Sequence, residues 1–181
     1  MRTSLIVHDD SQIIYYITDF EQEKRLYLHD VSNFREKAFY NKKIDCSIEV
    51  FIKEEIIIGK SAFENCTLTD FICVNGQERF FNKVEELYLH NKVELQYRAF
   101  ANCENLESVV FPLSKKIIIE NESFKNCSNL RTIVLLNDEE NESVYIAPNA
   151  FDYNEKLTFV CKSSSSVERY ARENNFRIVN V

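Results

Sequence analysis

The sequence predicts a β-rich α/β solenoid, in which short coils stack on one another and share a single core. A small residue followed by Phe recurs at Ala38-Phe39, Ala62-Phe63, Ala99-Phe100, Ser123-Phe124 and Ala150-Phe151. Alternating apolar segments flank these pairs, and the tetrapeptide Leu-Tyr-Leu-His occurs at both Leu26–His29 and Leu87–His90. Because one such unit cannot bury its apolar side alone, stacking the units buries one continuous core.

The first residues are expected to cap the array, because the terminal core of a solenoid would otherwise face water. Two apolar segments, Leu5–Val7 and Ile13–Ile17, are expected to pair as strands over the first coil. The chain therefore divides into an N-terminal cap (1–22), a repeat array (23–162) and a C-terminal cap (163–181).

Each repeat is expected to contain two short strands, one on either side of its Phe. Five positions before each Phe lies an apolar residue, namely Phe34, Ile58, Leu95, Ile119 or Ile146. A second apolar residue usually precedes it by two, which is the period of a strand with one buried face. The second strand reads Leu-x-x-apolar-x-apolar, as in Leu106, Val109 and Phe111.

The repeated Leu-Tyr-Leu-His belongs to this second strand. In the copy at Leu87–His90, the two leucines would face the core, with Tyr88 and His90 on the opposite side. The interval from one Phe to the next is 37 residues here, compared with 24 in two other repeats. We expect the surplus to form a short extra coil built on Val84–Leu89.

The residues after each Phe predict how the turns pack. Three repeats continue with Asn-Cys, at Asn65-Cys66, Asn102-Cys103 and Asn126-Cys127. We expect the Phe rings to stack as an internal ladder and the cysteines to fill buried turns as free thiols. A ladder of disulfides is the alternative, because adjacent strands lie about 4.8 Å apart. The six cysteines include no Cys-x-x-Cys and the three histidines are scattered, so no metal and no cofactor are expected.

The C-terminal cap is expected to be a helix followed by a strand. Ser165 and Glu168 have the spacing of a capping box. One apolar helical face follows, formed by Val167, Tyr170 and Ala171. A last short strand is expected to contain Phe176, Ile178 and Val179. The alternative for the serine run 163–166 is a flexible linker.

The charge balance excludes some classes of partner. A net charge of -7 argues against nucleic acid and anionic membrane surfaces, since both need a concentrated Lys/Arg patch. No stretch approaches the roughly 18 apolar residues of a membrane span, so membrane insertion is not expected. The N-terminus lacks the apolar core of a secretory signal, and from the sequence a cytoplasmic location is expected.

These motifs resemble the BspA-like leucine-rich repeat family, also called the type-5 leucine-rich repeat. The family pattern runs roughly Ile-Gly-x-x-Ala-Phe-x-x-Cys-x-x-Leu-x-x-Ile-x-Leu-Pro, and Ile58–Cys66 and Ala99–Pro112 match it. The resemblance covers about residues 26–181 and implies a leucine-rich repeat solenoid with a parallel concave sheet. The family's glycine survives only as Gly59 and is replaced by Arg35, Gln96, Glu120 and Ala147. Many relatives are exported surface proteins, which suggests the cell surface or secretion instead of the cytoplasm.

The same resemblance predicts a binding face. Residues that alternate with the core positions of the second strands would point out from the concave sheet. The predicted partner contacts are Arg25, Tyr27, His29, Asp70, Ile72, Glu86, Tyr88, His90, Val110 and Val134. Contiguous apolar and aromatic residues on an exposed face are typical of an interaction site. The alternatives are that strands simply favour such residues or that a loop covers the sheet.

The sequence predicts a protein-binding module and no enzyme. His29 and His90 would lie about 15 Å apart at the spacing of three coils, too far to share an ion. The repeated cysteines are expected to be buried, away from an activating base. Adhesion or host-protein binding is the first expectation, an intracellular scaffold or inhibitor the second, and glycan binding the third. The identity of the partner and the oligomeric state cannot be predicted from the residues.

Overall fold

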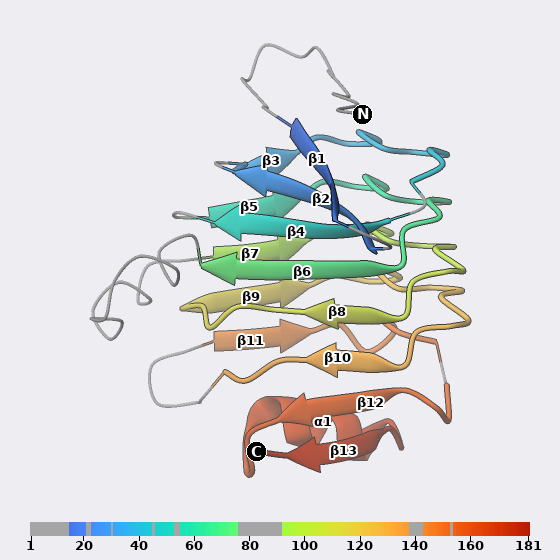
Figure 1. The fold of residues 1–181 in the computed structure, drawn as a ribbon. Coiled ribbons are helices and arrows are strands. Elements are labelled where there is room, and N and C mark those ends of the chain that lie inside the picture. The colour runs from blue at the N-terminus through green and yellow to red at the C-terminus, as the bar shows by residue number, and fades with distance from the viewer. Residues whose placement is uncertain are drawn as a thin grey trace.

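The structure, a computed structural model, describes residues 15–20, 23–29, 31–44, 46–52, 55–75, 92–137, 143–152 and 154–181. In these ranges the chain winds through stacked coils, most of which add one strand to each of two sheets (Figure 1). The single helix of the described residues, α1 (Ser166–Glu173), lies at the C-terminal end of the stack.

The first sheet has eight strands in the order β1-β2-β4-β6-β8-β10-β12-β13. β1 pairs antiparallel with β2, and each later neighbour pairs in parallel. The strands are β1 (Tyr15–Phe20), β2 (Glu23–His29), β4 (Ser47–Ile52), β6 (Asp70–Asn75), β8 (Ser108–Val110), β10 (Thr132–Val134), β12 (Thr158–Cys161) and β13 (Arg177–Asn180).

The second sheet has five parallel strands in the order β11-β9-β7-β5-β3. They are β3 (Asn33–Phe34), β5 (Glu55–Ile58), β7 (Lys92–Leu95), β9 (Lys116–Ile119) and β11 (Ser143–Ile146). Consecutive coils therefore place their strands side by side in both sheets, and the predicted fold class is confirmed.

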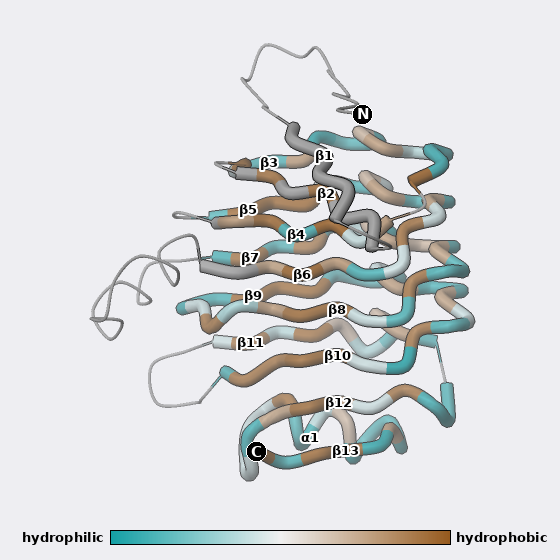
Figure 2. The backbone as a smooth tube through the Cα atoms, in the orientation of Figure 1, coloured by the Kyte–Doolittle hydropathy of each residue, from teal (hydrophilic) through white to brown (hydrophobic). Residues whose placement is uncertain are grey.

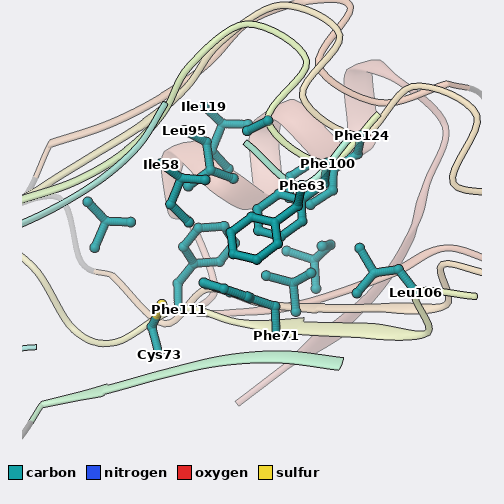
Figure 3. Packing of buried hydrophobic residues seen from close by; sticks show 14 of the residues in the cluster. Ile58, Phe63, Phe71, Cys73, Leu95, Phe100, Leu106, Phe111, Ile119 and Phe124 are labelled. Carbon is teal, nitrogen blue, oxygen red and sulfur yellow. The ribbon is translucent and has the colours of Figure 1, made fainter. Parts of the chain in front are cut away.

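One core runs the length of the stack, because the inward positions of both sheets are apolar. Figure 2 shows the hydrophobic residues concentrated along the strands and the hydrophilic ones in the turns. Ile58, Leu95 and Ile119 follow one another in the second sheet and are fully buried (Figure 3). Opposite them, Phe71 of β6 and Phe111, the residue after β8, belong to the same cluster.

The repeated Phe residues form the predicted ladder. Neighbouring rings stack with centroids 5.0 Å apart for Phe39–Phe63, 5.1 Å for Phe63–Phe100, 5.4 Å for Phe100–Phe124 and 4.7 Å for Phe124–Phe151. Their planes are within 7° of parallel, so each ring covers the next (Figure 3). The centroid distances are close to the inter-strand spacing, which explains why one Phe per coil suffices.

The turns around these rings adopt an unusual backbone without glycine. In each of the first four repeats, the second residue before Phe and the second residue after it have φ between 55° and 60°. The latter is always Asn, which tolerates the left-handed region better than most residues. The last three of these four Asn side chains also donate to the Asn one coil earlier, at 2.6 Å (Asn65 to Asn41), 2.9 Å (Asn102 to Asn65) and 2.7 Å (Asn126 to Asn102).

The cysteines are free thiols, as predicted for the repeated positions. Each thiol of the Asn-Cys motif donates to the carbonyl of a Phe one coil earlier: Cys66 to Phe39 at 2.7 Å, Cys103 to Phe63 at 2.9 Å and Cys127 to Phe100 at 3.1 Å. Cys is small enough for the buried turn and supplies the donor that these carbonyls accept.

Gly59 is retained for close packing and not for its φ, since no glycine among the described residues has a positive φ. A Cβ on Gly59 would lie 2.5 Å from the carbonyl oxygen of Phe34 and 2.8 Å from the Arg35 backbone. The amide of Gly59 donates to that same oxygen at 2.7 Å, so the neighbouring coil cannot move away without losing the bond.

The C-terminal helix begins as predicted, with one change in its capping. Ser165 Oγ accepts from the Glu168 amide at 3.2 Å, while the Glu168 carboxylate accepts from the Ser164 amide, one residue before the cap, at 2.6 Å. Glu168 also accepts from Arg172 at 2.7 Å and Asn180 at 3.0 Å, which joins α1 to β13. The helical face formed by Val167, Tyr170 and Ala171 packs on the core.

Two expectations about the strands need correction. β6 pairs directly with β8, so no strand lies between them and the extra coil predicted on Val84–Leu89 is wrong as a member of this sheet. Residues 76–91 themselves lie outside the described ranges. The strand predicted at Ile13–Ile17 is described from Tyr15 to Phe20 and pairs with β2, while Leu5–Val7 lies outside the described residues. The domain boundaries stay predictions.

Candidate functional site: the outer face of the first sheet

An aliphatic row crosses the outer face of the first sheet. Five adjacent strands, from β6 to β13, each contribute one residue in register: Ile72, Val110, Val134, Val160 and Val179. The first four are half-buried, and Val179 is 50% exposed. We call these five residues the aliphatic row. Neighbouring members lie one strand apart, about 4.8 Å, so together they form one continuous apolar strip.

A row of hydroxyl groups flanks the strip on the side where the strands begin. It consists of Ser47, Ser108, Thr132 and Thr158, with Asp70 between the two serines. The Asp70 carboxylate accepts from Ser108 Oγ at 2.5 Å and from Ser47 Oγ at 3.0 Å. These bonds fix the orientation of Asp70 at the edge of the strip and keep its charge on the surface.

The predicted contacts are only partly brought together by the structure. Asp70, Ile72, Val110 and Val134 share the outer face, in the predicted register. Arg25, Tyr27 and His29 lie in β2, with their backbones paired to Ser47, Glu49 and Phe51, but their side chains are not among those described. Glu86, Tyr88 and His90 lie outside the described residues, and the pairing of β6 with β8 excludes them from the predicted place between those strands.

Two residues of β4 are buried, although they occupy positions where outward-pointing, exposed side chains were expected. Glu49 lies in the column between Tyr27 and Ile72, yet only 7% of it is exposed. Phe51 is also 7% exposed. The described open apolar surface is therefore the aliphatic row, from β6 towards the C-terminal end.

Val160 and Val179 were missed by the prediction from sequence. Leu157-x-Phe159-x-Cys161 repeats the second-strand pattern, but one residue is missing between its Leu and the strand. Val179 was expected only as part of a last short strand with Phe176 and Ile178, without a place on the outer face. The alternation of Phe159 and Cys161, both buried, was the signal that would have placed Val160 on the outer face.

The outer face of the second sheet is more polar. Its central column reads Ile57, Glu94, Ile118 and Tyr145 across β5, β7, β9 and β11. Glu94 forms an ion pair with Lys92 at 2.5 Å, and this hydrogen bond holds the pKa of Glu94 below its ordinary value. The charge interrupts the column, so the first sheet carries the longer apolar strip.

The buried thiols are poor nucleophiles. Burial raises the pKa of Cys66 to about 11 and that of Cys127 to about 12, and it also raises the pKa values of Cys73, Cys103 and Cys161. A thiol that stays protonated at neutral pH neither attacks a substrate nor binds a metal readily. Across the described ranges, no group of His, Cys, Asp and Glu side chains is arranged to hold a metal ion.

In the part of the chain that the structure describes, no helix is both long and apolar enough to cross a bilayer.

Comparison with known proteins gives one match. The family described as BspA type Leucine rich repeat region matches residues 32–179 in six copies. No curated protein and no solved structure matches the chain. The matched segment contains both sheets from β3 to β13, including the whole aliphatic row.

Proposed function

The chain belongs to the BspA type leucine-rich repeat family, and from this premise we propose that it binds a partner protein through the outer face of its first sheet. Leucine-rich repeats are in general protein-interaction modules. The aliphatic row is the observation that carries the proposal. A contiguous apolar strip beside a polar edge has the composition of an interface core with its rim.

The proposed contacts divide by their physical role. Desolvation of the aliphatic row supplies the favourable free energy, roughly in proportion to the apolar area removed from water. Asp70 and the hydroxyl row at its edge set orientation, because hydrogen bonds at a rim contribute more to specificity than to affinity. Arg25, Tyr27 and His29 stay proposed contacts at the β2 end of the same sheet.

A protein partner fits this strip better than a glycan. Sugars stack on flat aromatic rings, whereas every member of the aliphatic row is Val or Ile. The large exposed aromatic side chains among the described residues, Tyr97 at 38% and Tyr145 at 55%, lie elsewhere. Tyr145 belongs to the second sheet and Tyr97 to a turn.

Adhesion to an external protein and scaffolding or inhibition inside the cell both use such a face. Protease treatment of intact cells, with this chain followed by antibody, separates these two roles. Loss of the chain places it outside and supports adhesion. Protection until lysis supports the intracellular role.

Site-specific photo-crosslinking tests the proposed face directly. A benzophenone side chain replaces Val134 in one variant and Ile118 in the other, since both residues are half-buried and central in their sheets. We expect the variant at position 134 to form a discrete adduct with a partner in cells of the source organism. Equal adducts from both positions, or one from position 118 alone, would contradict the proposal.

A further inference from the structure

A groove of about 660 Å³ is lined by residues of the last two Phe-containing turns of the stack. It lies between the turn that contains Phe124 and the turn that contains Phe151, beside the residues that lead into β10 and β12. Pockets for small ligands have volumes of this order, about 300–1,000 Å³, so the groove has room for a side chain with its flanking backbone.

The Asn and thiol ladders between turns end beside the groove, whereas the Phe rings still stack at 4.7 Å and the Phe124 amide still donates to the Ala150 carbonyl at 2.9 Å. Earlier turns are joined by the Asn side-chain ladder, by the thiol-to-carbonyl bonds and by backbone bonds such as Asn102 N to Lys125 O at 2.7 Å. The fifth repeat lacks Asn-Cys. Its Asp152 carboxylate accepts a hydrogen bond from the backbone amide of Asn126 at 2.6 Å. The side-chain amide of Asn154 donates to the Leu130 carbonyl at 2.7 Å.

The end of the side-chain ladders leaves hydrogen-bond acceptors among the residues that line the groove. In earlier turns, the Asn Oδ1 and the Phe carbonyl each accept from the following coil. In the described part of the chain, Asn126 Oδ1 has no such donor, and the Phe124 carbonyl accepts from the Cys127 amide of its own turn at 3.4 Å but from no thiol. The Asp152 carboxylate lies beside them. The wall is therefore rich in acceptors.

The charges at the rim of the groove and its apolar floor further restrict the chemical class of a ligand. Glu104, Asp152 and Glu155 line the groove, against one ammonium group from Lys156. The floor is formed by the edges of core residues, namely Phe124, Leu130, Phe151 and Leu157. A fitting ligand is cationic, carries several donors and no acceptors, and has an apolar stem.

We propose that this groove binds an arginine side chain of a partner protein. The guanidinium group offers five donors in one plane and no acceptor, and its methylene stem packs on apolar surface. Leu130 and Leu157 lead into the strands that carry Val134 and Val160, so the groove adjoins the proposed binding face. The net charge of -7 favours a basic partner.

This inference rests on the proposed function only in that the arginine belongs to a bound protein. A short peptide fills the groove without covering the aliphatic row. Its binding and crosslinking at position 134 can therefore fail independently of each other.

The test is an NMR titration of the ¹⁵N-labelled chain with two peptides that differ in one group. The first has a single arginine between glycine and serine residues, and the second carries citrulline, a neutral isostere, in its place. The backbone amides of Asn126, Leu130 and Leu157 report occupancy of the groove. We expect the arginine peptide to shift these signals and the citrulline peptide to leave them unchanged.

Two variants check which carboxylate is responsible. Asp152→Asn keeps an oxygen acceptor for the Asn126 amide but removes the charge, and we expect about fivefold weaker peptide binding, the upper range for an exposed ion pair. Glu36→Gln, on an exposed residue of the first repeat, is the matched control and should bind as the parent does.

Three results would overturn the proposal. The first is that the citrulline peptide shifts the same signals equally, and the second is that the arginine peptide shifts signals near exposed carboxylates elsewhere in the chain. The third is that Asp152→Asn binds the arginine peptide with unchanged affinity. If Asp152→Asn disturbs the fold, Glu155→Gln provides the same comparison, since Glu155 is exposed.

Discussion

Truncation of the central ring of the Phe ladder should destabilise the whole stack. Phe100 is fully buried, and its ring stacks against Phe63 at 5.1 Å and Phe124 at 5.4 Å. A third ring, Phe71, meets it edge-on at 4.9 Å. Phe100→Ala therefore opens a cavity that no neighbour fills without breaking a second ring contact.

The expected cost is about 3–5 kcal/mol, the usual range for a buried Phe-to-Ala change. For a chain of this size, each kcal/mol lowers the melting temperature by about 2–4 °C, so a drop of roughly 6–20 °C is expected. Phe39→Ala should cost less, because Phe39 begins the described ladder and is 4% exposed, whereas Phe100 is fully buried. Urea unfolding followed by circular dichroism measures both variants.

An exposed aromatic residue provides the control. Tyr145→Ala, at a position that is 55% exposed, should change stability by less than about 1 kcal/mol. If Phe100→Ala unfolds at the same urea concentration as Tyr145→Ala, the ladder is not part of the core and the packing argument fails.

Three further predictions concern other parts of the stack. Gly59→Ala should cost about 1–3 kcal/mol in thermal unfolding, because its Cβ would overlap the Phe34 carbonyl; parental stability would contradict this. Hydrogen bonds from Asn180, Arg172 and the Ser164 amide hold the pKa of Glu168 at about 2, below its ordinary 4.5. Its stabilising contribution is complete above pH 4.5 and lost as the pH falls towards 2, so the melting temperatures of the parent and Glu168→Gln should converge in acid. Iodoacetamide at pH 8 should label the half-buried Cys46 in the native chain and the other five thiols only after unfolding, as mass spectrometry would show.

Most of the fold follows from local patterns that repeat. The small-Phe pairs and the apolar alternation before them predicted the ring ladder and the second sheet, because both depend only on residues within one coil. The free thiols followed from the position of Cys beside a buried turn. Such features can be predicted from sequence because every coil packs on its neighbours in the same way.

The errors arose where the repeats are irregular. The match between Leu26–His29 and Leu87–His90 suggested a common strand, but four matching residues do not determine which strands pair. The register of β6 with β8 is set by the coils on either side and not by that match. Likewise, the hydrogen bonds that hold Asp70 join side chains from three strands, and the groove beside Asp152 depends on what a neighbouring turn lacks.

The close packing at Gly59 is another feature that the sequence pattern alone did not explain. A pattern shows that glycine stands at one repeat and larger residues at the others, but only the backbone of the preceding coil shows why. The turns without this glycine keep their shape through residues with positive φ, Asn above all.

The most direct test of the proposed binding face is the affinity of a crosslinked partner, once identified, for two variants that each carry one added positive charge. Val134→Lys places an ammonium group in the middle of the aliphatic row, and Ile118→Lys does the same on the second sheet. The account predicts at least a tenfold loss of affinity for Val134→Lys, which corresponds to about 1.4 kcal/mol, and parental affinity for Ile118→Lys. Parental affinity for Val134→Lys in a folded chain would contradict the central claim that this partner binds the outer face of the first sheet.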